Sequence, residues 1–275
     1  MFTDKITLTN NKLNKVSVML TRMKARKIAD DEKATVKKLV KRVDLGKGTV
    51  EQVEDEVVSE KSICLYVDNK SFTTFTCSPT KTKELVIGNL LTQGIISRLE
   101  EIKHLQIQKG KVNVKLQRDI KTLPRILRKP EKKEASQDFI LNPETILNAA
   151  KVLDVKAAIF RRTGGTHAAA LLDVKGEVLV FSEDISRHNA VDKVIGEAAL
   201  KRINLAKTLL ASTGRVSSEI VTKAANANIP AIVSLASPTD KGIDAAERTG
   251  LTLIGFARDR RFNVYAHPER IRMNK

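Results

Sequence analysis

A regular alternation of short apolar segments and helix-like segments in the C-terminal half constrains the fold more than any other feature. The stretch "THAAALLDVKGEVLVFSED" (166–184) has the pattern of a hairpin that turns at Gly176, and the strand-like segments "KTLLAST" (207–213), "PAIVSLAS" (230–237) and "LTLIGFA" (251–257) follow it. Helix-like segments of about a dozen residues separate them, which predicts a parallel sheet with helices on its faces. The opening hairpin is antiparallel, so we expect a mixed sheet in an α/β fold.

Polar and basic clusters follow the ends of these strands. They are "SEDISRH", "STGRVSSE", "ASPTD" and "FARDRR". In open α/β sheets ligands bind beyond the carboxyl ends of the parallel strands. Helices that begin at Ser186, Ser217 and Thr239 would present free backbone N–H groups at the same place. We therefore expect the clusters to share one anion-binding edge.

The cluster that begins the first of these helices has two interpretations. Ser186 is a good helix cap, but Arg187 and His188 lie in the first turn, where the helix dipole disfavours a cation. A ligand or an acidic neighbour would explain them as well as a structural role does. Asp192 and Lys193, farther along, are expected to be exposed helix residues.

The stretch "RRTGGTHAAA" offers a second candidate ligand contact. Gly164 and Gly165 would let the backbone approach a ligand closely, whereas the alternative is a simple turn followed by a buried His167. The pattern lacks the acidic residue of a zinc deaminase, and no P-C-x-x-C follows it. The chain also has no Walker loop and no G-x-G-x-x-G motif, so zinc hydrolysis and those two modes of nucleotide binding are unsupported.

The charge of the chain favours an anionic partner. The formal net charge is +17 with an isoelectric point near 9.9, which suits nucleic acid, a phosphate-rich cofactor or an acidic protein. Aromatic residues make up only 4% of the chain, which argues against a base-stacking surface for RNA. The N-terminus lacks the pattern of a secretory signal, and no apolar run approaches the roughly 20 residues that span a bilayer. A cytoplasmic protein without a membrane partner is expected.

The composition divides the chain into three parts. Residues 1–45 form a basic N-terminal extension, expected to be a charged helix or a flexible arm. Residues 46–134 form a smaller α+β domain that ends in a basic linker. Residues 135–275 form the larger α/β domain, whose first helix starts with Asn142 as cap and Pro143 in the first turn.

Two cysteines lie in a predicted hairpin, "SICLYVDNKSFTTFTC" (62–77). A turn centred on Asn69 and Lys70 would place Cys64 opposite Phe75 and leave Cys77 as its diagonal neighbour on the same face. The diagonal spacing of about 7–8 Å is too long for a disulfide. We therefore expect reduced cysteines that pack as small apolar residues.

Several longer motifs, in a fixed order, resemble those of one known family. They are "RTGGTHAAALLD", "GEVLVFSEDISRHNAVDKVIG", "GRVSSEIVTKAA" and "GIDAAERTGLTLIGFARDRRFNVYAHPERI", with "ELVIGNLLTQGII" upstream. On these motifs the chain resembles the FdhD family, the formate dehydrogenase accessory proteins. The resemblance implies a larger domain similar to cytidine deaminases but without their zinc. It also implies that sulfur is taken from a cysteine desulfurase and delivered to the molybdenum cofactor of formate dehydrogenase, Mo-bis(molybdopterin guanine dinucleotide).

The resemblance also implies partners and a ligand site. The partners are a formate dehydrogenase and a cysteine desulfurase, and a homodimer is allowed. The guanine-nucleotide end of the cofactor is expected at Phe256, Ala257, Arg258, Asp259, Arg260 and Arg261. The rim of the site should also include Gly164, Gly165, His167, Asp184, Arg187, His188, Arg215, Ser217 and Ser218. Of these, Asp184, Arg187 and Arg215 should line a common cleft with Arg258; no residue is assigned a catalytic or metal-binding role.

The chain departs from the family at one point. The family carries a C-x-x-C loop between its two domains, one cysteine of which receives the persulfide, but the corresponding "LRKPEKKEASQDF" (127–139) contains no cysteine. Ser136 cannot replace it, because a thiolate is needed to accept and pass on sulfane sulfur. Three functions therefore stay open: a sulfur-transferring accessory protein, a non-catalytic cofactor chaperone or scaffold, and a nucleic-acid-binding protein that uses its basic extension.

Overall fold

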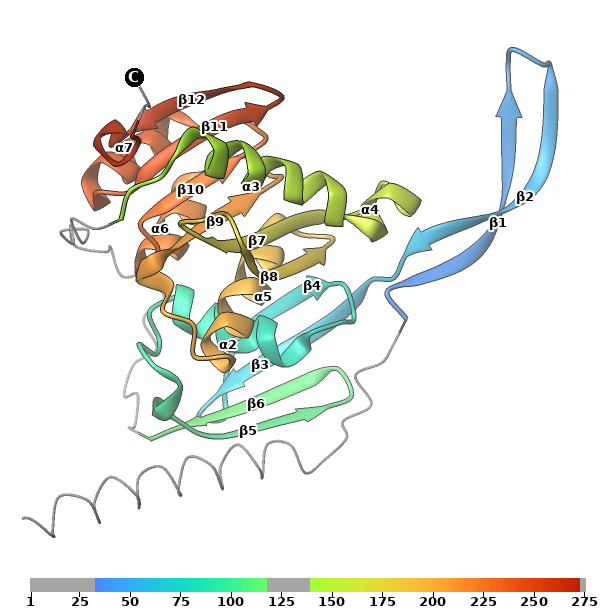
Figure 1. Cartoon of the computed structure of the whole chain (residues 1–275). Coiled ribbons are helices and arrows are strands. Elements are labelled where there is room, and N and C mark those ends of the chain that lie inside the picture. Colours follow the sequence, from blue (N-terminus) through green and yellow to red (C-terminus); the bar gives the residue numbers. More distant parts are fainter. Residues whose placement is uncertain (1–32, 118–138, 273–275) are drawn as a thin grey trace, which may run out of the picture. The chain divides into compact units, whose positions relative to one another are not determined.

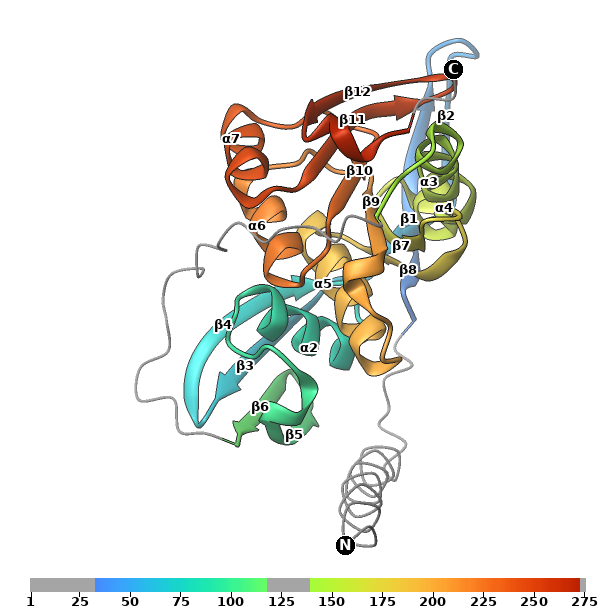
Figure 2. The same cartoon turned by 60° about the vertical axis from the view of Figure 1, so that its left-hand side comes forward.

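The computed structural model describes residues 33–117 and 139–272. Its largest element is a six-stranded sheet with the strand order β12-β11-β10-β9-β7-β8 (Figures 1 and 2). The strands are β7 (His167–Asp173), β8 (Val178–Asp184), β9 (Thr208–Ser212), β10 (Ala231–Ser234), β11 (Thr252–Arg258) and β12 (Arg261–Ala266). The expected hairpin of β7 and β8 and the three later strands are thereby confirmed.

The sheet is mixed, as the sequence predicts. Strands β9, β10 and β11 are parallel, while β7 is antiparallel to both β8 and β9. Strand β8 therefore runs in the same direction as β9, β10 and β11. The carboxyl ends of these four strands meet at one edge, which we call the C-terminal edge.

Helices cover both faces of this sheet. On one face, α3 (Pro143–Lys156) packs against alternate strand residues such as Leu209 and Ala211. On the other face, α5 (Arg187–Leu200), α6 (Ser218–Asn226) and α7 (Asp240–Thr249) pack against Leu210 and its neighbours. The period-2 alternation of apolar residues along each strand supplies both cores. Short 3-10 helices span Leu99–Glu101, Leu205–Lys207 and Pro268–Arg270.

A second, four-stranded sheet has the order β4-β3-β6-β5. Its strands are β3 (Lys61–Val67), β4 (Lys70–Cys77), β5 (Ile102–Gln108) and β6 (Lys111–Leu116). Helix α2 (Thr82–Thr92) lies between this sheet and α5 (Figure 2), and Gly94 follows it in a left-handed conformation, as the helix-stop signal predicts. The four-stranded sheet, α2, α5 and the α5 face of the larger sheet share one continuous hydrophobic cluster.

Helices α2 and α5 cross at two glycines. A Cβ atom at Gly88 would lie 1.7 Å from the carbonyl oxygen of Asp192, and one at Gly196 would lie 1.9 Å from that of Glu84. Neither position has room for any side chain, because the nearest atoms are backbone on the facing helix. The two glycines therefore fix how closely these helices approach.

A two-stranded hairpin, β1 (Thr35–Asp44) and β2 (Thr49–Val58), extends away from the sheets (Figure 1). We call it the arm. The expectation of a charged helix or a flexible extension is therefore wrong for Thr35–Asp44, and residues 1–32 lie outside the described residues. Valines of β1 are paired with valines of β2, as at Val40↔Val53 and Val43↔Val50, and such cross-strand pairs stabilise a hairpin. The sequence of β1 alone does not indicate this strand, because the pairing partners lie on β2.

The register of the β3–β4 hairpin differs from the expected one. Asp68 and Asn69, rather than Asn69 and Lys70, adopt positive φ, and the register shifts beyond Leu65. Cys64 consequently lies opposite Thr74, while Cys77 lies opposite Lys61 on the other face of the sheet. The two thiols form no disulfide with each other.

Within residues 33–117 and 139–272, no helix is long and apolar enough to cross a membrane.

Candidate functional site

The C-terminal edge carries the helix starts that the sequence predicts. Ser186, Ser217 and Thr239 are the residues that precede α5, α6 and α7. Only the Thr239 side chain caps its helix, by accepting a hydrogen bond from the Gly242 N–H. The Ser217 Oγ is buried and has no hydrogen-bond partner in the described part of the chain. Free N–H groups at the starts of α5 and α6 are therefore available at this edge.

A cavity of about 440 Å³ opens at the same edge, on the side of α3. Three of the expected site residues line it: Gly164, Gly165 and His167. Most of the remaining wall is apolar, and it comes from Leu153, Ala157, Phe160, Ala168, Ile185 and Leu235. An apolar cavity with a few polar groups is typical of a site for an organic ligand.

One wall of the cavity is the short helix α4 (Ala158–Thr163), which has no buried residue. Glu183, at the end of β8, anchors this helix to the sheet. Its carboxylate accepts hydrogen bonds from the N–H groups of Ile159 (3.1 Å) and Phe160 (2.8 Å) and from the Thr166 hydroxyl (2.9 Å). A carboxylate at a helix start also complements the helix dipole. Glu183 was not singled out from the sequence, because nothing local marks which acid of "SEDISRH" turns toward α4.

His167 lies at the cavity wall, with its Nδ1 3.3 Å from the Thr213 Oγ1. Its pKa is lowered by burial and by the positive charge of Arg187, against a smaller opposing effect of Asp184. Arg187 itself packs over Gly214, where a Cβ would come within 2.6 Å of its Cδ. Its Nε is buried without a hydrogen-bond partner among the described residues.

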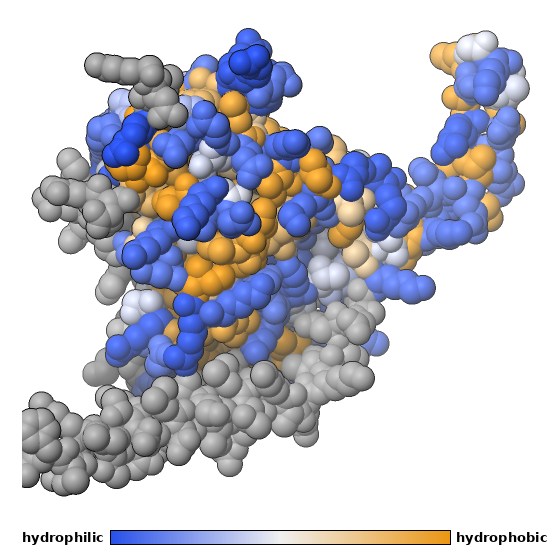
Figure 3. All heavy atoms as spheres, viewed as in Figure 1, coloured by the Kyte–Doolittle hydropathy of each residue, from blue (hydrophilic) through white to orange (hydrophobic). Residues whose placement is uncertain are grey.

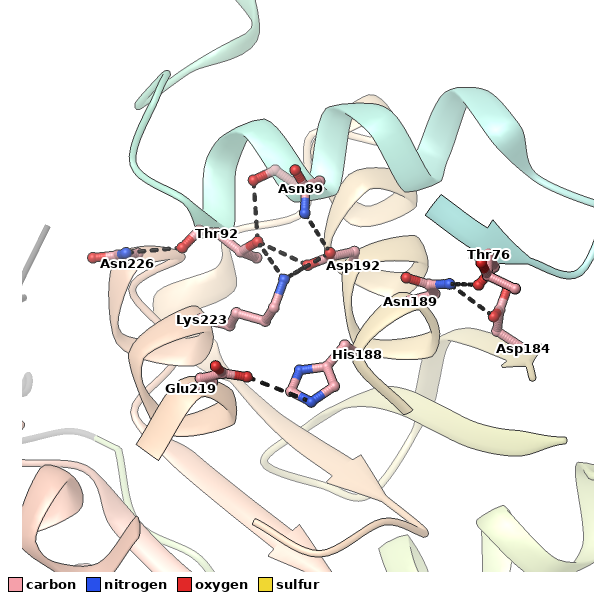
Figure 4. Close-up of polar contacts among 10 residues, drawn as sticks. All are labelled: Thr76, Asn89, Thr92, Asp184, His188, Asn189, Asp192, Glu219, Lys223 and Asn226. Carbon is pink, nitrogen blue, oxygen red and sulfur yellow. Dashed lines mark hydrogen bonds and ion pairs between the residues drawn. The ribbon is translucent and has the colours of Figure 1, made fainter. Parts of the chain in front are cut away.

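On the other side of the sheet, His188 faces the start of α6 (Figure 4). Its Nε2 lies 3.6 Å from a carboxylate oxygen of Glu219. Burial lowers the pKa of His188, as do the charges of Arg187 and Lys223, while Glu219 and Asp192 act in the opposite direction. The acidic neighbour that would justify a histidine in this turn is therefore present.

Asp184 points inward. Its carboxylate accepts hydrogen bonds from the N–H groups of Ser78 (3.1 Å) and Ser186 (2.9 Å) and from the Asn189 amide (3.1 Å), and it forms a 2.6 Å ion pair with Lys193. Both members of that ion pair are fully buried. Asp184 thus organises the start of α5 from within.

A second buried ion pair joins three helices (Figure 4). The Lys223 Nζ lies 2.7 Å from both carboxylate oxygens of Asp192, which also accept hydrogen bonds from Thr92 (2.7 Å) and Asn89 (2.9 Å). The expectation that Asp192 and Lys193 are exposed is therefore wrong. In the sequence, apolar residues flank Asp192 and Lys193, and Gly196 follows one turn later. This pattern indicates a helix that is covered on all sides.

The "FARDRR" motif forms the hairpin between β11 and β12. Ala257 is buried, whereas Arg258, Asp259, Arg260 and Arg261 are exposed. Phe256 adopts a positive φ of 51°, and the Arg258 guanidinium lies 5.9 Å from the centre of its ring. Arg215, between β9 and α6, is exposed as well, and Ser218 begins α6.

The strand order separates these candidates along the edge. Three strands, β10, β9 and β7, lie between β11 and β8, so the end of β11 is about 19 Å from the end of β8 at a spacing of about 4.8 Å per strand. The residues thus share one edge, and a ligand would need to be long to reach Arg187 and Arg258 together. The expectation that Asp184 lines a cleft with these arginines is wrong, because its side chain is fully buried. The convergence of Arg187, Arg215 and Arg258 on one cleft stays a prediction.

The described residues contain no group of three or more His, Cys, Asp or Glu side chains placed to hold a metal ion.

A model of the FdhD/NarQ family matches residues 58–272. The chain belongs to this family. It is 36% identical over 246 residues to the sulfur carrier protein FdhD of Staphylococcus haemolyticus, which covers 82% of this chain and 93% of that protein.

Other relatives agree. The sulfur carrier protein FdhD of Bacillus subtilis is 34% identical over 255 residues, which is 82% of this chain and 94% of that protein. A crystal structure from Desulfotalea psychrophila, provisionally described as a formate dehydrogenase accessory protein, superposes with a TM-score of 0.75 at 27% identity. It covers 86% of this chain and 99% of its own. The mixed α/β fold is thus shared with the family.

Proposed function

We propose that this protein is a formate dehydrogenase accessory protein that binds Mo-bis(molybdopterin guanine dinucleotide) and takes part in the transfer of sulfur to it from a cysteine desulfurase. One observation carries the proposal. The C-terminal edge combines an apolar cavity with Arg187, whose buried Nε has no partner among the described residues. A buried, unpaired guanidinium N–H is costly unless a ligand accepts from it.

The chemistry of the edge fits an elongated anion. The helix starts of α5 and α6 and the side chain of Arg187 suit phosphate oxygens, and the apolar cavity suits a ring system. The exposed "FARDRR" hairpin, about 19 Å away along the edge at the usual strand spacing, suits the guanine end that the family resemblance implies there. The molybdenum cofactor is the cargo, and it supplies the metal to which sulfur is delivered.

Calorimetry with GDP tests the binding part. The double variant Arg258→Ala/Arg260→Ala should weaken GDP binding by more than about tenfold, because a charge-assisted hydrogen bond contributes about 1.5–3 kcal/mol. Arg248→Ala, in the last turn of α7, removes a charge of the same kind far from the C-terminal edge and serves as the control. Unchanged affinity in the double variant would contradict the proposal.

A non-catalytic cofactor chaperone or scaffold is the second candidate, and the cysteines favour it. The chain has two; Cys77 is buried, and Cys64 faces away from the α2 side of its sheet, opposite Thr74. Incubation with a cysteine desulfurase and cysteine, followed by peptide mass spectrometry, separates the candidates. A persulfide on either cysteine, lost with client activation in the Cys→Ser variant, supports transfer; cofactor binding without added sulfur supports the chaperone.

Finer expectations from the resemblance stay part of the proposal. They are a zinc-free fold like that of cytidine deaminases for residues 135–275, a smaller α+β domain with a basic linker at residues 46–134, a cytoplasmic location, and complexes with a formate dehydrogenase, a cysteine desulfurase and a second copy of the chain. Superposition on a cytidine deaminase tests the first. Cell fractionation and co-purification with each tagged partner test the others.

A further inference from the structure

Phe160 is the most exposed aromatic residue within residues 33–117 and 139–272. It is 48% exposed, whereas the other phenylalanines and the tyrosines of these residues are buried or only partly exposed. It belongs to α4, between α3 and the arm, where Figure 3 shows hydrophobic (orange) and hydrophilic (blue) residues side by side at the surface. Phe160 also lines the cavity of about 440 Å³. A large apolar side chain left in water beside an apolar cavity indicates a contact for a ligand.

The backbone of Phe160 is fixed from both ends of α4. The Glu183 carboxylate accepts a hydrogen bond from its N–H at 2.8 Å, and its carbonyl oxygen accepts one from the Gly164 N–H at 2.7 Å. Gly164 ends the helix with a positive φ of 67°, a conformation that favours glycine. Both backbone polar atoms of Phe160 are thus occupied, and the ring is the group that it presents to the cavity.

The neighbouring arginines of α4 have partners within the protein, and the Phe160 ring is not packed into the core. Arg161 donates to the Asp154 carbonyl at 2.8 Å, and Arg162 donates to the Glu56 carboxylate at 3.1 Å. Among the described residues, neither of the two hydrophobic clusters includes Phe160. A ligand that covers this ring would therefore be stabilised by the burial of its apolar surface.

The lining of the cavity suits a ring and not a phosphate. None of its twelve residues is a lysine or an arginine, so the lining offers no side-chain cation to a phosphate. Its apolar wall includes Leu153 of α3 and Leu235, which follows β10. His167 supplies a polar group. Because burial lowers the pKa of His167, the imidazole is neutral at neutral pH and can form a hydrogen bond with the edge of a heterocycle.

We propose that the Phe160 ring stacks on a flat heterocycle bound in the cavity and so selects ligands that carry one. The shared chemistry is the fused aminopyrimidinone ring that guanine and pterin have in common. The inference rests on the proposed function, whose cofactor contains both rings, and it places one such ring in the cavity and the phosphates outside it. Aromatic rings attract each other beyond the effect of buried apolar area, which an aliphatic side chain at this position would not reproduce.

Tryptophan fluorescence in the full-length protein tests the stacking. The chain contains no tryptophan, so Phe160→Trp places the only one at the cavity. Titration with GDP and, separately, with carboxypterin should quench its emission for the ligand whose ring enters the cavity. Leu105→Trp, on β5 of the four-stranded sheet, is the control. Its emission should fall only as far as absorption by the ligand accounts for.

Calorimetry with the same two ligands tests the contribution to affinity. Phe160→Ala should raise the dissociation constant at least about fivefold, the lower end of what stacking on a base contributes. Phe160→Leu keeps much of the apolar area and should still raise it at least about twofold, while Phe160→Tyr should keep the parent's affinity. Because Phe160 is half exposed, none of these variants should change the unfolding temperature appreciably.

The outcomes separate this inference from the proposed function. Loss of affinity for GDP alone identifies the ring in the cavity as guanine, and loss for carboxypterin alone identifies it as pterin; both support the stacking. A parent that binds either ligand with an affinity that Phe160→Ala or Phe160→Leu leaves unchanged overturns the inference and leaves the proposed function standing. A parent that binds neither ligand overturns both. If Phe160→Trp does not bind, the series of Ala, Leu and Tyr variants decides.

Discussion

The junction of α2, α5 and α6 and the short helix α4 border the same edge of the sheet but are held in opposite ways. At the junction, Gly88 and Gly196 allow direct backbone contact, and Asp192 and Lys223 form a buried ion pair. Helix α4 buries no residue, and polar contacts to Glu183 and to Glu56 of the arm hold it. We therefore expect the junction to be rigid and α4 to open more readily, since elements with few buried contacts open most readily.

The buried ion pairs of α5 contribute to the specificity of its packing more than to the stability of the protein. Removing two charges from water costs about as much as their attraction returns, so replacing both partners with apolar residues is often neutral, whereas removing one is strongly destabilising. Asp192 and Lys193 are adjacent on α5 and form ion pairs with different elements. Asp192 is paired with Lys223 on α6, and Lys193 with Asp184 on β8. We infer that the two pairs fix the rotation of α5 about its axis.

The largest expected effect comes from filling the helix crossing. Gly196→Ala or Gly88→Ala should lower the free energy of unfolding by more than about 4 kcal/mol, beyond the usual 1–3 kcal/mol of overpacking, because backbone atoms of the facing helix must move. Urea denaturation measures it. Gly46→Ala, in the turn of the arm, is the control and should change stability little. A crossing variant as stable as this control would show that the helices can separate freely.

Breaking the buried pair is next in size. Asp192→Ala should cost about 3–5 kcal/mol, because Lys223 is left buried without its counter-ion. The double variant Asp192→Leu/Lys223→Met should recover most of that loss, since no uncompensated charge remains. Denaturant titration of the two variants gives the comparison. A double variant that is less stable than Asp192→Ala would mean that the pair itself is strongly stabilising.

Loosening the cavity wall should have a smaller and more local effect. Glu183→Gln keeps the shape of the side chain but loses one acceptor oxygen and the charge, so we expect a loss of about 1–2 kcal/mol. Hydrogen exchange of residues 158–166 should accelerate while α2 and α5 keep their protection. Glu177→Gln, exposed in the turn of the same hairpin, is the control. Unchanged exchange in α4 would show that other contacts hold the wall.

The smallest expected effect is a pH dependence from His167 and His188. Both have a pKa lowered in the folded protein, chiefly by burial and next by Arg187. The unfolded chain therefore binds more protons, so stability is full above the unfolded pKa of about 6.5 and is lost as the pH falls through the lower folded pKa. Unfolding temperatures measured from pH 8 to pH 5 should fall less steeply in His188→Gln than in the parent. Equal slopes would remove His188 as a contributor.

Sequence patterns predicted much of the architecture because they are local. Period-2 apolar runs and helix caps indicated every strand of the larger sheet before β12, and Ser186, Ser217 and Thr239 do precede helices. The direction rule for α/β sheets then placed the candidate residues at one edge. The register of the β3–β4 hairpin was missed, because the positive φ of Asp68 and a shift beyond Leu65 depend on the whole sheet.

By itself, the sequence determined the family, the mixed α/β sheet and the edge at which polar residues gather, because apolar period and turn chemistry act between near neighbours along the chain. Only the tertiary structure decided which polar residues turn inward. Asp192 is buried because α2, about 100 residues earlier in the chain, covers it, and Glu183 meets α4 only after the sheet has formed. A local pattern such as the apolar residues around Asp192 indicates that a helix is covered, but which distant element covers it is decided only by the tertiary structure.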